Sequence, residues 1–464
     1  MKKIIIDVAH VKCLIAALAP FKDDGNSIHF EFGIGGKFRK IEDGEKQGMA
    51  KLADNRATLV SKGSQICKVF FAYIKDSSDL VEGEHYAAFN LKAADTLSLL
   101  NALESYEMDI ELSIEDEGTR VKVSIPGVTE VYLNTIVDEE MEPMLPFQKN
   151  VVIAQMELDA KGFQSLVQQG GSLVQSIDAD AIANRVVIHF TEKTAEMYST
   201  NRNAVEKAWM EANGSFHPVN LAMKELSAYA ETLSGEEKQK LQEKMKAAGK
   251  ENLAKLAEEY GFDTKSFTIS FAYTNFPQLC SVIKGEGTAN IFVSPAYCYV
   301  TKDSVGACFA LAGKANQIVY VINSCNLEKY PYRICIDKAE LLKGLSFLET
   351  ASSLGGESKK EAKLKLSMTQ GKLEMSMNTS EVKVHVLSLT EESRDGFKNC
   401  VVNPKYIKTI ASAQEGANLT LCMAEEAKVP LLVSTGGLEC EDATARAIIM
   451  RIASEETGYE STDE

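Results

Sequence analysis

The sequence lacks the residue patterns that usually mark a catalytic or metal site. Its ten cysteines include no Cys-x-x-Cys pair, and its six histidines are scattered singly. A zinc site needs several such ligands at short spacing, and a catalytic centre needs a nucleophile, acid or base grouped with its partners. The sequence therefore predicts a protein without catalytic site, metal or cofactor.

A long apolar run is also missing. No run approaches the roughly 18–20 residues that a membrane-spanning helix needs, and Asp7 and His10 interrupt the apolar stretch that a signal sequence would require. Cysteines such as Cys280 and Cys422 lie within apolar segments, which is typical of buried, reduced thiols. We expect a soluble, cytoplasmic protein with no membrane partner.

Basic charge is scarce as well. The chain has 50 Lys and Arg against 66 Asp and Glu, a formal net charge of −16. A protein that adheres to nucleic acid over its whole surface usually carries a basic excess. Simple adhesion is therefore excluded, and any contact with DNA must come from an uneven distribution of charge.

The sequence does contain a repeated unit. Residues 397–423, FKNCVVNPKYIKTIASAQEGANLTLCM, read as an apolar strand, a short helix opened by Pro404 and an alternating strand, and further alternating segments follow at 429–434 and 445–452. Five other copies open with IIIDVAH, HYAAFNL, VVIAQME, SFTISFA and YRICIDK. Each copy predicts a half-unit of one strand, one helix and three strands.

Six half-units indicate an α+β protein of three similar domains. One helix covers one face of a small antiparallel sheet, so a half-unit must share its core with a second one. Prolines interrupt the strand pattern at 143–146 and at Pro331, where we place the boundaries. The predicted domains are 1–149, 150–332 and 333–453, followed by an acidic tail at 454–464.

One segment departs from the repeat. About residues 213–264, inside the middle domain, the chain is rich in Ala, Glu and Lys, and Leu226, Leu233, Leu241, Met245, Leu253 and Leu256 recur at helical spacing. We predict an inserted helical pair that turns near Ser234–Gly235 and Gly249. It is either a solvated structural insertion or an arm that docks a partner.

Several phrases resemble one known family. The ending ARAIIMRI, the phrase VNPKYIKTI, and the pairing of FQSLVQQGGSLVQ with AEMYSTNRNAV are similar to the bacterial DNA polymerase III beta subunit, the beta sliding clamp. The family ending Met-Pro-Met-Arg-Leu is here Ile448 to Ile452 without the proline, and the family turn Thr-Asp-Gly-His-Arg is here Thr200 to Ala204. The resemblance implies a divergent member with the DNA clamp fold.

The family resemblance implies a function in DNA replication. Such a clamp is a processivity factor, a homodimeric ring that encircles and slides on double-stranded DNA without catalysing a reaction. It tethers the DNA polymerase and clamp loader subunits through short peptides that enter a hydrophobic cleft between the middle and last domains. Carried over by position, the cleft residues are Ala183, Thr200, Val205, Pro331, Ile448, Met450, Arg451 and Ile452.

The predicted helices carry the charge that a DNA-facing surface would need. The windows 8–22, 92–105, 160–175, 274–285, 338–353 and 404–414 contain nine lysines and four acids, so they carry +5 while the remainder carries −21. We expect weak, sequence-independent phosphate contacts, which permit sliding. The candidate residues are Lys12, Lys22, Lys92, Lys161, Gln169, Lys284, Lys338, Lys343, Lys405 and Lys408.

Two alternatives remain open at this stage. The chain could be a clamp-like interaction module that no longer encircles DNA, for which the altered turn at 201–204 and the insertion both speak. It could also be an enzyme whose active site is not recognisable in the sequence. A cluster of perturbed acids in a pocket would favour the enzyme.

Overall fold

The computed structural model describes residues 2–22, 26–33, 38–43, 46–51, 56–60, 66–70, 85–115, 118–136, 152–174, 185–272, 276–312, 327–354, 362–369, 371–378, 382–389, 400–426 and 428–452. The chain forms two compact units. Unit 1 comprises Met1–Lys161, Gly214–Lys265 and Thr274–Leu311, and unit 2 comprises Gly162–Asn213, Ser266–Tyr273 and Ala312–Glu464.

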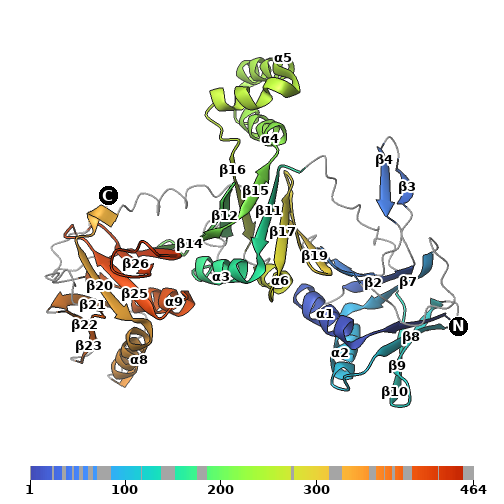
Figure 1. Ribbon diagram of the computed structural model, residues 1–464, viewed down its shortest axis with the longest axis horizontal. Coiled ribbons are helices and arrows are strands. Elements are labelled where there is room, and N and C mark those ends of the chain that lie inside the picture. The colour runs from blue at the N-terminus through green and yellow to red at the C-terminus, as the bar shows by residue number, and fades with distance from the viewer. Residues whose placement is uncertain are drawn as a thin grey trace. The chain divides into compact units, whose positions relative to one another are not determined.

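Six copies of the predicted half-unit occur among the described residues, in three consecutive pairs (Figure 1). In the first pair, one half-unit consists of β1 Lys2–Ile6, α1 Val8–Leu18, β2 Ser27–Gly33, β5 Arg56–Val60 and β6 Ile66–Phe70. The other consists of β7 His85–Lys92, α2 Ala93–Glu104, β8 Ile110–Glu115, β9 Arg120–Ile125 and β10 Thr129–Asn134. In the second pair, one half-unit consists of β11 Ala154–Asp159, α3 Ala160–Gly170, β12 Arg185–Thr191, β13 Thr194–Thr200 and β14 Ala204–Glu211. The other consists of β16 Ser266–Ala272, α6 Phe276–Val282, β17 Thr288–Val293, β18 Tyr297–Lys302 and β19 Val305–Ala310. In the third pair, one half-unit consists of β20 Tyr332–Asp337, α8 Lys338–Leu354, β21 Leu364–Thr369, β22 Lys372–Met377 and β23 Lys383–Leu387. The other consists of β24 Cys400–Val402, α9 Pro404–Ala413, β25 Asn418–Met423, β26 Leu431–Thr435 and β27 Ala445–Ile449.

The first half-unit contains an addition that the repeat did not predict. Strands β3 Phe38–Asp43 and β4 Lys46–Lys51 pair with each other as a separate two-stranded sheet between β2 and β5. Because β2 pairs directly with β5, the three-strand pattern of the half-unit continues past this hairpin.

The two half-units of each pair exchange their first strands. β1 pairs with β8 while β7 pairs with β2; β11 pairs with β17 while β16 pairs with β12; and β20 pairs with β25 while β24 pairs with β21. Every pairing is antiparallel. Each half-unit therefore completes its sheet only with a strand from its partner, which explains why half-units come in pairs. The domain boundary predicted near 149 lies outside the described residues, and both boundaries stay predictions.

Larger sheets form where the last strands of half-units meet. In unit 1, β19 pairs with β6 and creates a nine-stranded sheet that ends in β15 Asn213–Phe216 and β7. In unit 2, β14 pairs with β27 and creates an eight-stranded sheet. The two remaining last strands, β10 and β23, each lie at the edge of a four-stranded sheet.

Local sequence signals fix the helices. In α9 the side chain of Asn403 accepts a hydrogen bond from the backbone N–H of Lys405, and Pro404 occupies the first turn, where its missing N–H costs nothing. Ile407 and Ile410 are fully buried in a core that α8 and α9 share with strands of both sheets of the third pair. Truncating Ile407 to alanine would cost about 2–5 kcal/mol of stability.

The predicted helical insertion is present. α4 spans Pro218–Ala230 and α5 spans Gly235–Glu259, and Gly249 interrupts α5 with a φ of 60° that glycine adopts without strain. All six residues of the predicted stripe pack together: Leu226, Leu233, Leu241, Met245, Leu253 and Leu256. The insertion, which we call the arm and which contains α4 and α5 in Figure 1, thus has an apolar core of its own.

Because the arm has its own core, we expect it to be dispensable for the rest of the fold. Replacing residues 221–262 with a Gly/Ser linker keeps Asn220, whose amide donates to the Val152 carbonyl at 2.8 Å. The variant should unfold with a thermal midpoint close to that of the parent chain, since loop length costs little. As a control, Leu226→Asp should melt the arm alone. Insoluble linker variants would show that the arm supports the remaining core.

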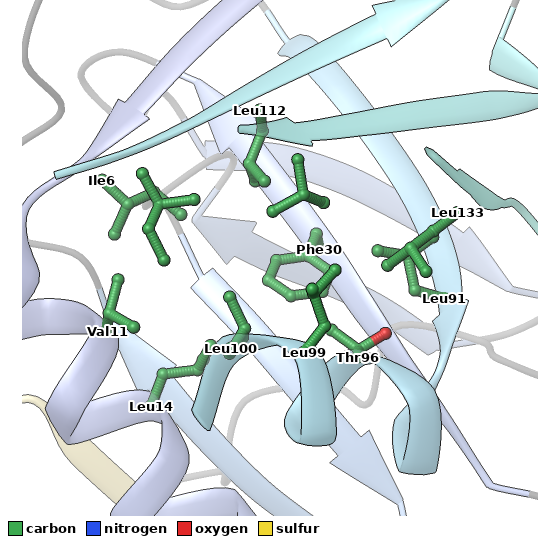
Figure 2. A pocket seen from close by; sticks show the side chains of 12 residues that line it. Ile6, Val11, Leu14, Phe30, Leu91, Thr96, Leu99, Leu100, Leu112 and Leu133 are labelled. Atoms are coloured by element: carbon green, nitrogen blue, oxygen red, sulfur yellow. The ribbon is translucent and has the colours of Figure 1, made fainter. Parts of the chain in front are cut away.

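Unit 1 encloses a small apolar cavity between α1, α2 and the strands above them (Figure 2). Its volume is about 10 Å³, which is roughly the space that one water requires. The hydroxyl of Thr96 at its edge already donates to the Lys92 carbonyl at 2.8 Å. The cavity is therefore a packing defect of the core and offers no polar group to a ligand.

Candidate functional site

Strands β14 and β27 bring distant residues of unit 2 onto one sheet face. Val205 of β14 lies opposite Ile448 of β27, which lies opposite Leu432 of β26. Directly paired residues point to the same face, so these side chains form a row across the junction. Ile449 points the other way and packs in the core beneath α8 and α9. The row therefore occupies the face opposite those helices.

Apolar residues gather around this row, and we call them the junction cluster. Its buried members are Val187, Tyr198, Val205, Tyr330, Cys422, Ala424, Leu432, Cys440, Ala443 and Ile448, and its partly buried members are Trp209, Leu327 and Val429. The partly buried members keep contact with solvent. The cluster therefore reaches the surface.

Two predicted cleft residues belong to the junction cluster, and both are core residues in this chain. Val205 and Ile448 are only 8% and 3% exposed. Thr200 is also buried, and its hydroxyl donates to the Ala204 carbonyl at 2.7 Å while accepting from the backbone N–H of Arg202. Thr200 thus shapes the β13–β14 turn.

The other predicted cleft residues follow or precede strands of the same sheet. Met450 is 50% exposed, and its backbone N–H donates to the Asn203 carbonyl at 2.8 Å. Arg451 donates to the carbonyls of Ala424 and Glu426, while the N–H of half-buried Ile452 donates to the Val401 carbonyl. Pro331 is exposed beside buried Tyr330. Ala183 lies outside the described residues.

Sequence reasoning chose only Val205 and Ile448 from the junction cluster, and Trp209 and Tyr330 are among the members that it missed. Trp209 follows Val205 at a spacing of four on the same strand, so strand periodicity places both on one face. Tyr330 precedes Pro331 directly, and its ring is fully buried in the cluster. Trp209 could have been found by extending the period of two from Val205, whereas Tyr330 is adjacent to Pro331 and that period does not reach it.

Charged side chains border the junction cluster. Lys207 Nζ lies 2.9 Å from a carboxylate oxygen of Glu196, which also accepts a hydrogen bond from the Tyr198 hydroxyl. Arg333 pairs with Glu439 at 2.9 Å. Arg446 lies over the Trp209 ring, with its guanidinium carbon 5.5 Å from the ring centre.

Two thiols meet within the cluster. The hydrogen bond with Cys422 is the main cause that lowers the pKa of Cys440, and Ser434, Arg446 and Arg333 add to the effect against the opposing influence of burial. The same hydrogen bond, together with burial, raises the pKa of Cys422. Cys440 is therefore the first of the two to ionise.

The nine lysines chosen from the helices divide into two groups. Four have a carboxylate within ion-pair distance: Lys12 with Glu107, Lys92 with Asp95, Lys343 with Glu340 and Lys408 with Glu349. A fifth, Lys338, donates to the Gln414 carbonyl at 2.8 Å. Among the described residues no ion pair involves the remaining four, which are exposed: Lys22, Lys161, Lys284 and Lys405.

Gln169 does not belong with these lysines. Its side chain is 3% exposed, and its amide donates to the Ser165 hydroxyl at 2.7 Å. A buried amide on α3 cannot reach a phosphate outside the fold. The structure therefore argues against a contact between Gln169 and DNA.

A carboxyl group is buried beside the junction. Glu206 of β14 lies opposite Ser199 and Ala447, is 0% exposed and accepts a hydrogen bond from the Ser172 hydroxyl just after α3. Burial raises its pKa to about 8, although the bonds from Ser172 oppose the shift. Glu206 is therefore protonated at neutral pH and links α3 to the strand that carries Val205.

This raised pKa predicts a pH-dependent stability. In the unfolded chain the carboxyl ionises near its ordinary pKa of 4.5, whereas the folded chain keeps the proton to about pH 8. The folded state binds more protons in that window, so the free energy of unfolding falls as pH rises through it. Glu206→Gln should come close to the parent at pH 5 and exceed its thermal midpoint by several °C at pH 8.5, because a pKa raised from 4.5 to about 8 corresponds to about 4 kcal/mol of stability lost by the parent between these pH values. The exposed Glu157→Gln serves as control, and an equal gain at both pH values would contradict the assignment.

Within the described ranges, no three His, Cys, Asp or Glu side chains come together as metal ligands. The helices of the same ranges include none long and apolar enough to cross a membrane. The eight cysteines described are all free thiols.

Solved structures of bacterial replication proteins share this architecture. The beta subunit of DNA polymerase III from Thermotoga maritima superposes with a TM-score of 0.66 and 12% identity over 97% of this chain and 99% of that chain. The chain has the fold of a beta sliding clamp. The beta subunit from Streptococcus pyogenes gives a TM-score of 0.67 with 13% identity, covering 98% of this chain and all of that one.

A third clamp structure, from Helicobacter pylori, holds a DNA ligase peptide and has a TM-score of 0.65 with 11% identity, covering 98% of this chain and 100% of that chain. No protein-family model and no curated protein matches the sequence. This chain thus has the clamp fold at very low sequence identity to these structures, with three similar domains of two half-units and a helical arm in the middle one.

Proposed function

We propose that the chain is a DNA polymerase processivity factor, a non-catalytic cytoplasmic protein that forms a homodimeric ring around duplex DNA. The observation that carries this proposal is how the last strand of each half-unit pairs. β19 joins β6 and β14 joins β27 inside the chain, whereas β10 and β23 remain at sheet edges. Pairing β10 of one copy with β23 of the next would repeat the same junction and close a head-to-tail ring.

Exposed apolar side chains at these two edges support this pairing. Val128, Tyr132 and Ile136 are 47%, 42% and 39% exposed on and beside β10. Leu387 and Leu389 are 65% and 50% exposed at the end of β23. Large exposed apolar groups at an open sheet edge are typical of a surface that is covered by another chain.

The exposed lysines of the helices are consistent with a ring that stays on DNA because it encloses the duplex. Two copies supply twelve half-unit helices, and each copy offers four exposed lysines with no ion pair among the described residues: Lys22, Lys161, Lys284 and Lys405. A few phosphate contacts give weak, salt-sensitive attraction. A topologically linked ring needs no more, because tight contacts would prevent sliding.

Partners would dock on the junction cluster. The clamp from Helicobacter pylori was solved with a DNA ligase peptide. In this chain the corresponding proposal is that polymerase and clamp-loader peptides lie along the β14–β27 junction, between Met450 at one end and Trp209 at the other, and place apolar side chains on it. Exposed Met450 and half-buried Trp209 offer contact area above the buried Val205 and Ile448.

The mass of the protein in solution tests the ring. Sedimentation equilibrium should give a species of twice the 50.8 kDa chain mass at micromolar concentration. A monomer at all concentrations would favour the second candidate, a clamp-like interaction module that no longer encircles DNA. Acidic side chains pair with Lys12, Lys92, Lys343 and Lys408 and offset their positive charge. This supports the second candidate, because these lysines then attract phosphate less strongly.

A further inference from the structure

Arg446 is a cation at the surface of the junction cluster that no carboxylate of the described residues balances. Arg446 of β27 lies opposite Lys207 of β14 and Ser434 of β26, on the same face as Ile448. It is half-buried. Within the described part of the chain no acidic oxygen comes within ion-pair distance of its guanidinium.

The neighbouring cations differ from Arg446 in this respect. Lys207 is paired with Glu196 at 2.9 Å, and Arg333 is paired with Glu439 at 2.9 Å and also donates to the carbonyls of Tyr330 and Leu327. Unlike these two neighbours on the sheet, Arg446 keeps a positive charge that an outside partner could neutralise.

The contacts of Arg446 orient its guanidinium without neutralising it. One terminal nitrogen donates to the Cys440 carbonyl at 3.2 Å, the guanidinium carbon lies over the Trp209 ring at 5.5 Å from its centre, and Nε is buried without a partner. A guanidinium has five N–H donors arranged for bidentate contact with a carboxylate. The hydrogen bond to Cys440 and the cation–π contact with Trp209 restrict the guanidinium before a partner arrives, which lowers the entropy lost on binding.

A peptide that covered this surface would also remove Arg446 from water. Met450 lies opposite Asn203 and Trp209 lies opposite Thr444, so Arg446 lies between them along the sheet. An extended peptide that runs from Met450 towards Trp209 would bury the guanidinium further, and an unpaired buried charge is strongly unfavourable. A carboxylate on the peptide offsets that cost through charge-assisted hydrogen bonds. The surface therefore discriminates between peptides that bring a carboxylate and those that do not.

We propose that the peptides that dock on the junction cluster carry an Asp or Glu side chain beside their apolar anchor, and that Arg446, held on Trp209, binds this carboxylate. The proposal rests on the peptide-docking role of the junction cluster and defines the chemical class of its partners. Arg446 acts as a specificity-determining residue, while Met450 and the cluster provide apolar contact.

The test uses synthetic hexapeptides with acetylated and amidated ends, so that no terminal charge contributes. Leu and Phe serve as anchors, one Asp occupies each remaining position in turn, and a matched set carries Asn instead. Affinity is measured by isothermal titration with the full-length protein. The emission of Trp209, the single tryptophan of the chain, reports whether binding occurs at this face.

At one or more positions the Asp peptide should bind at least tenfold more tightly than its Asn counterpart. Arg446→Gln should abolish that preference, by weakening the binding of the Asp peptide and strengthening the binding of the Asn peptide, which no longer buries an unpaired charge. Arg446→Lys should retain a smaller preference for Asp. The control Lys244→Gln removes a similar cation, 5.4 Å from the Tyr260 ring centre in the arm, and should keep the full preference. Thermal midpoints confirm that each variant is folded.

The outcomes separate this proposal from the docking role itself. Equal affinity for Asp and Asn peptides in the parent protein, with a response of Trp209 emission, would overturn the role of Arg446 and leave the docking site in place. Absence of binding by every peptide would overturn both. A preference for Asp that survives in folded Arg446→Gln would assign the carboxylate to another residue and refute the proposal.

Discussion

Replacing Leu387 with aspartate should convert the protein from a dimer to a monomer. Leu387 is the last residue of β23 and is 65% exposed in the single chain, so the change costs the subunit little stability. In the proposed β10–β23 junction, the same position is covered by the partner copy. An unpaired carboxylate there would be desolvated at a cost of several kcal/mol, which weakens the dimer by at least about 100-fold.

Sedimentation velocity over a range of concentrations measures this effect. Met223→Asp is a matched control, because Met223 is also a large exposed apolar residue, at 47%, but lies on α4 of the arm. The control should remain dimeric. If Leu387→Asp and the control sediment alike as dimers, β23 is not at the subunit interface.

Met450→Ala should weaken the binding of partner peptides by at least roughly tenfold, about 1.4 kcal/mol, without changing the dimer mass. The side chain is 50% exposed, whereas its backbone N–H bond to Asn203 does not depend on the side chain. Stability should therefore change little. Peptide affinity and thermal midpoint are measured on the same sample.

Ile448→Ala is the comparison for Met450→Ala. Ile448 is 3% exposed in the junction cluster, so its truncation should lower stability by about 2–5 kcal/mol before it affects binding. Removing Ile452 onward would also delete the N–H that donates to the Val401 carbonyl. If Met450→Ala leaves affinity unchanged in a folded protein, Met450 does not belong to the binding surface.

The half-units could be predicted because their signal is local. The helix period and strand alternation of each copy are set by neighbouring residues, and all six helices lie within the windows chosen from the sequence or extend at most one residue beyond them. The exchange of first strands could not be predicted, because β1 and β8 are brought together by chain reversal across about a hundred residues. The β3–β4 hairpin breaks the repeat and had no counterpart to reveal it.

The candidate site was predictable only in part, for a similar reason. Strand alternation tells which residues share a face but not how deeply that face is covered, so exposed Met450 and buried Ile448 looked alike. The ion pairs within one turn, such as Lys92 with Asp95, follow from helical spacing. The pair between Lys408 and Glu349 joins two helices and required the structure.

Retention on end-blocked DNA tests the ring most directly. Labelled protein is incubated with immobilised linear duplex, the free end is closed with biotin and streptavidin, and the sample is washed at high salt, which removes phosphate contacts. A ring should remain on closed DNA, slide off open DNA, and leave when a restriction enzyme cuts the duplex. Protein that is lost equally from closed and open DNA, or that stays after the cut, would contradict encirclement.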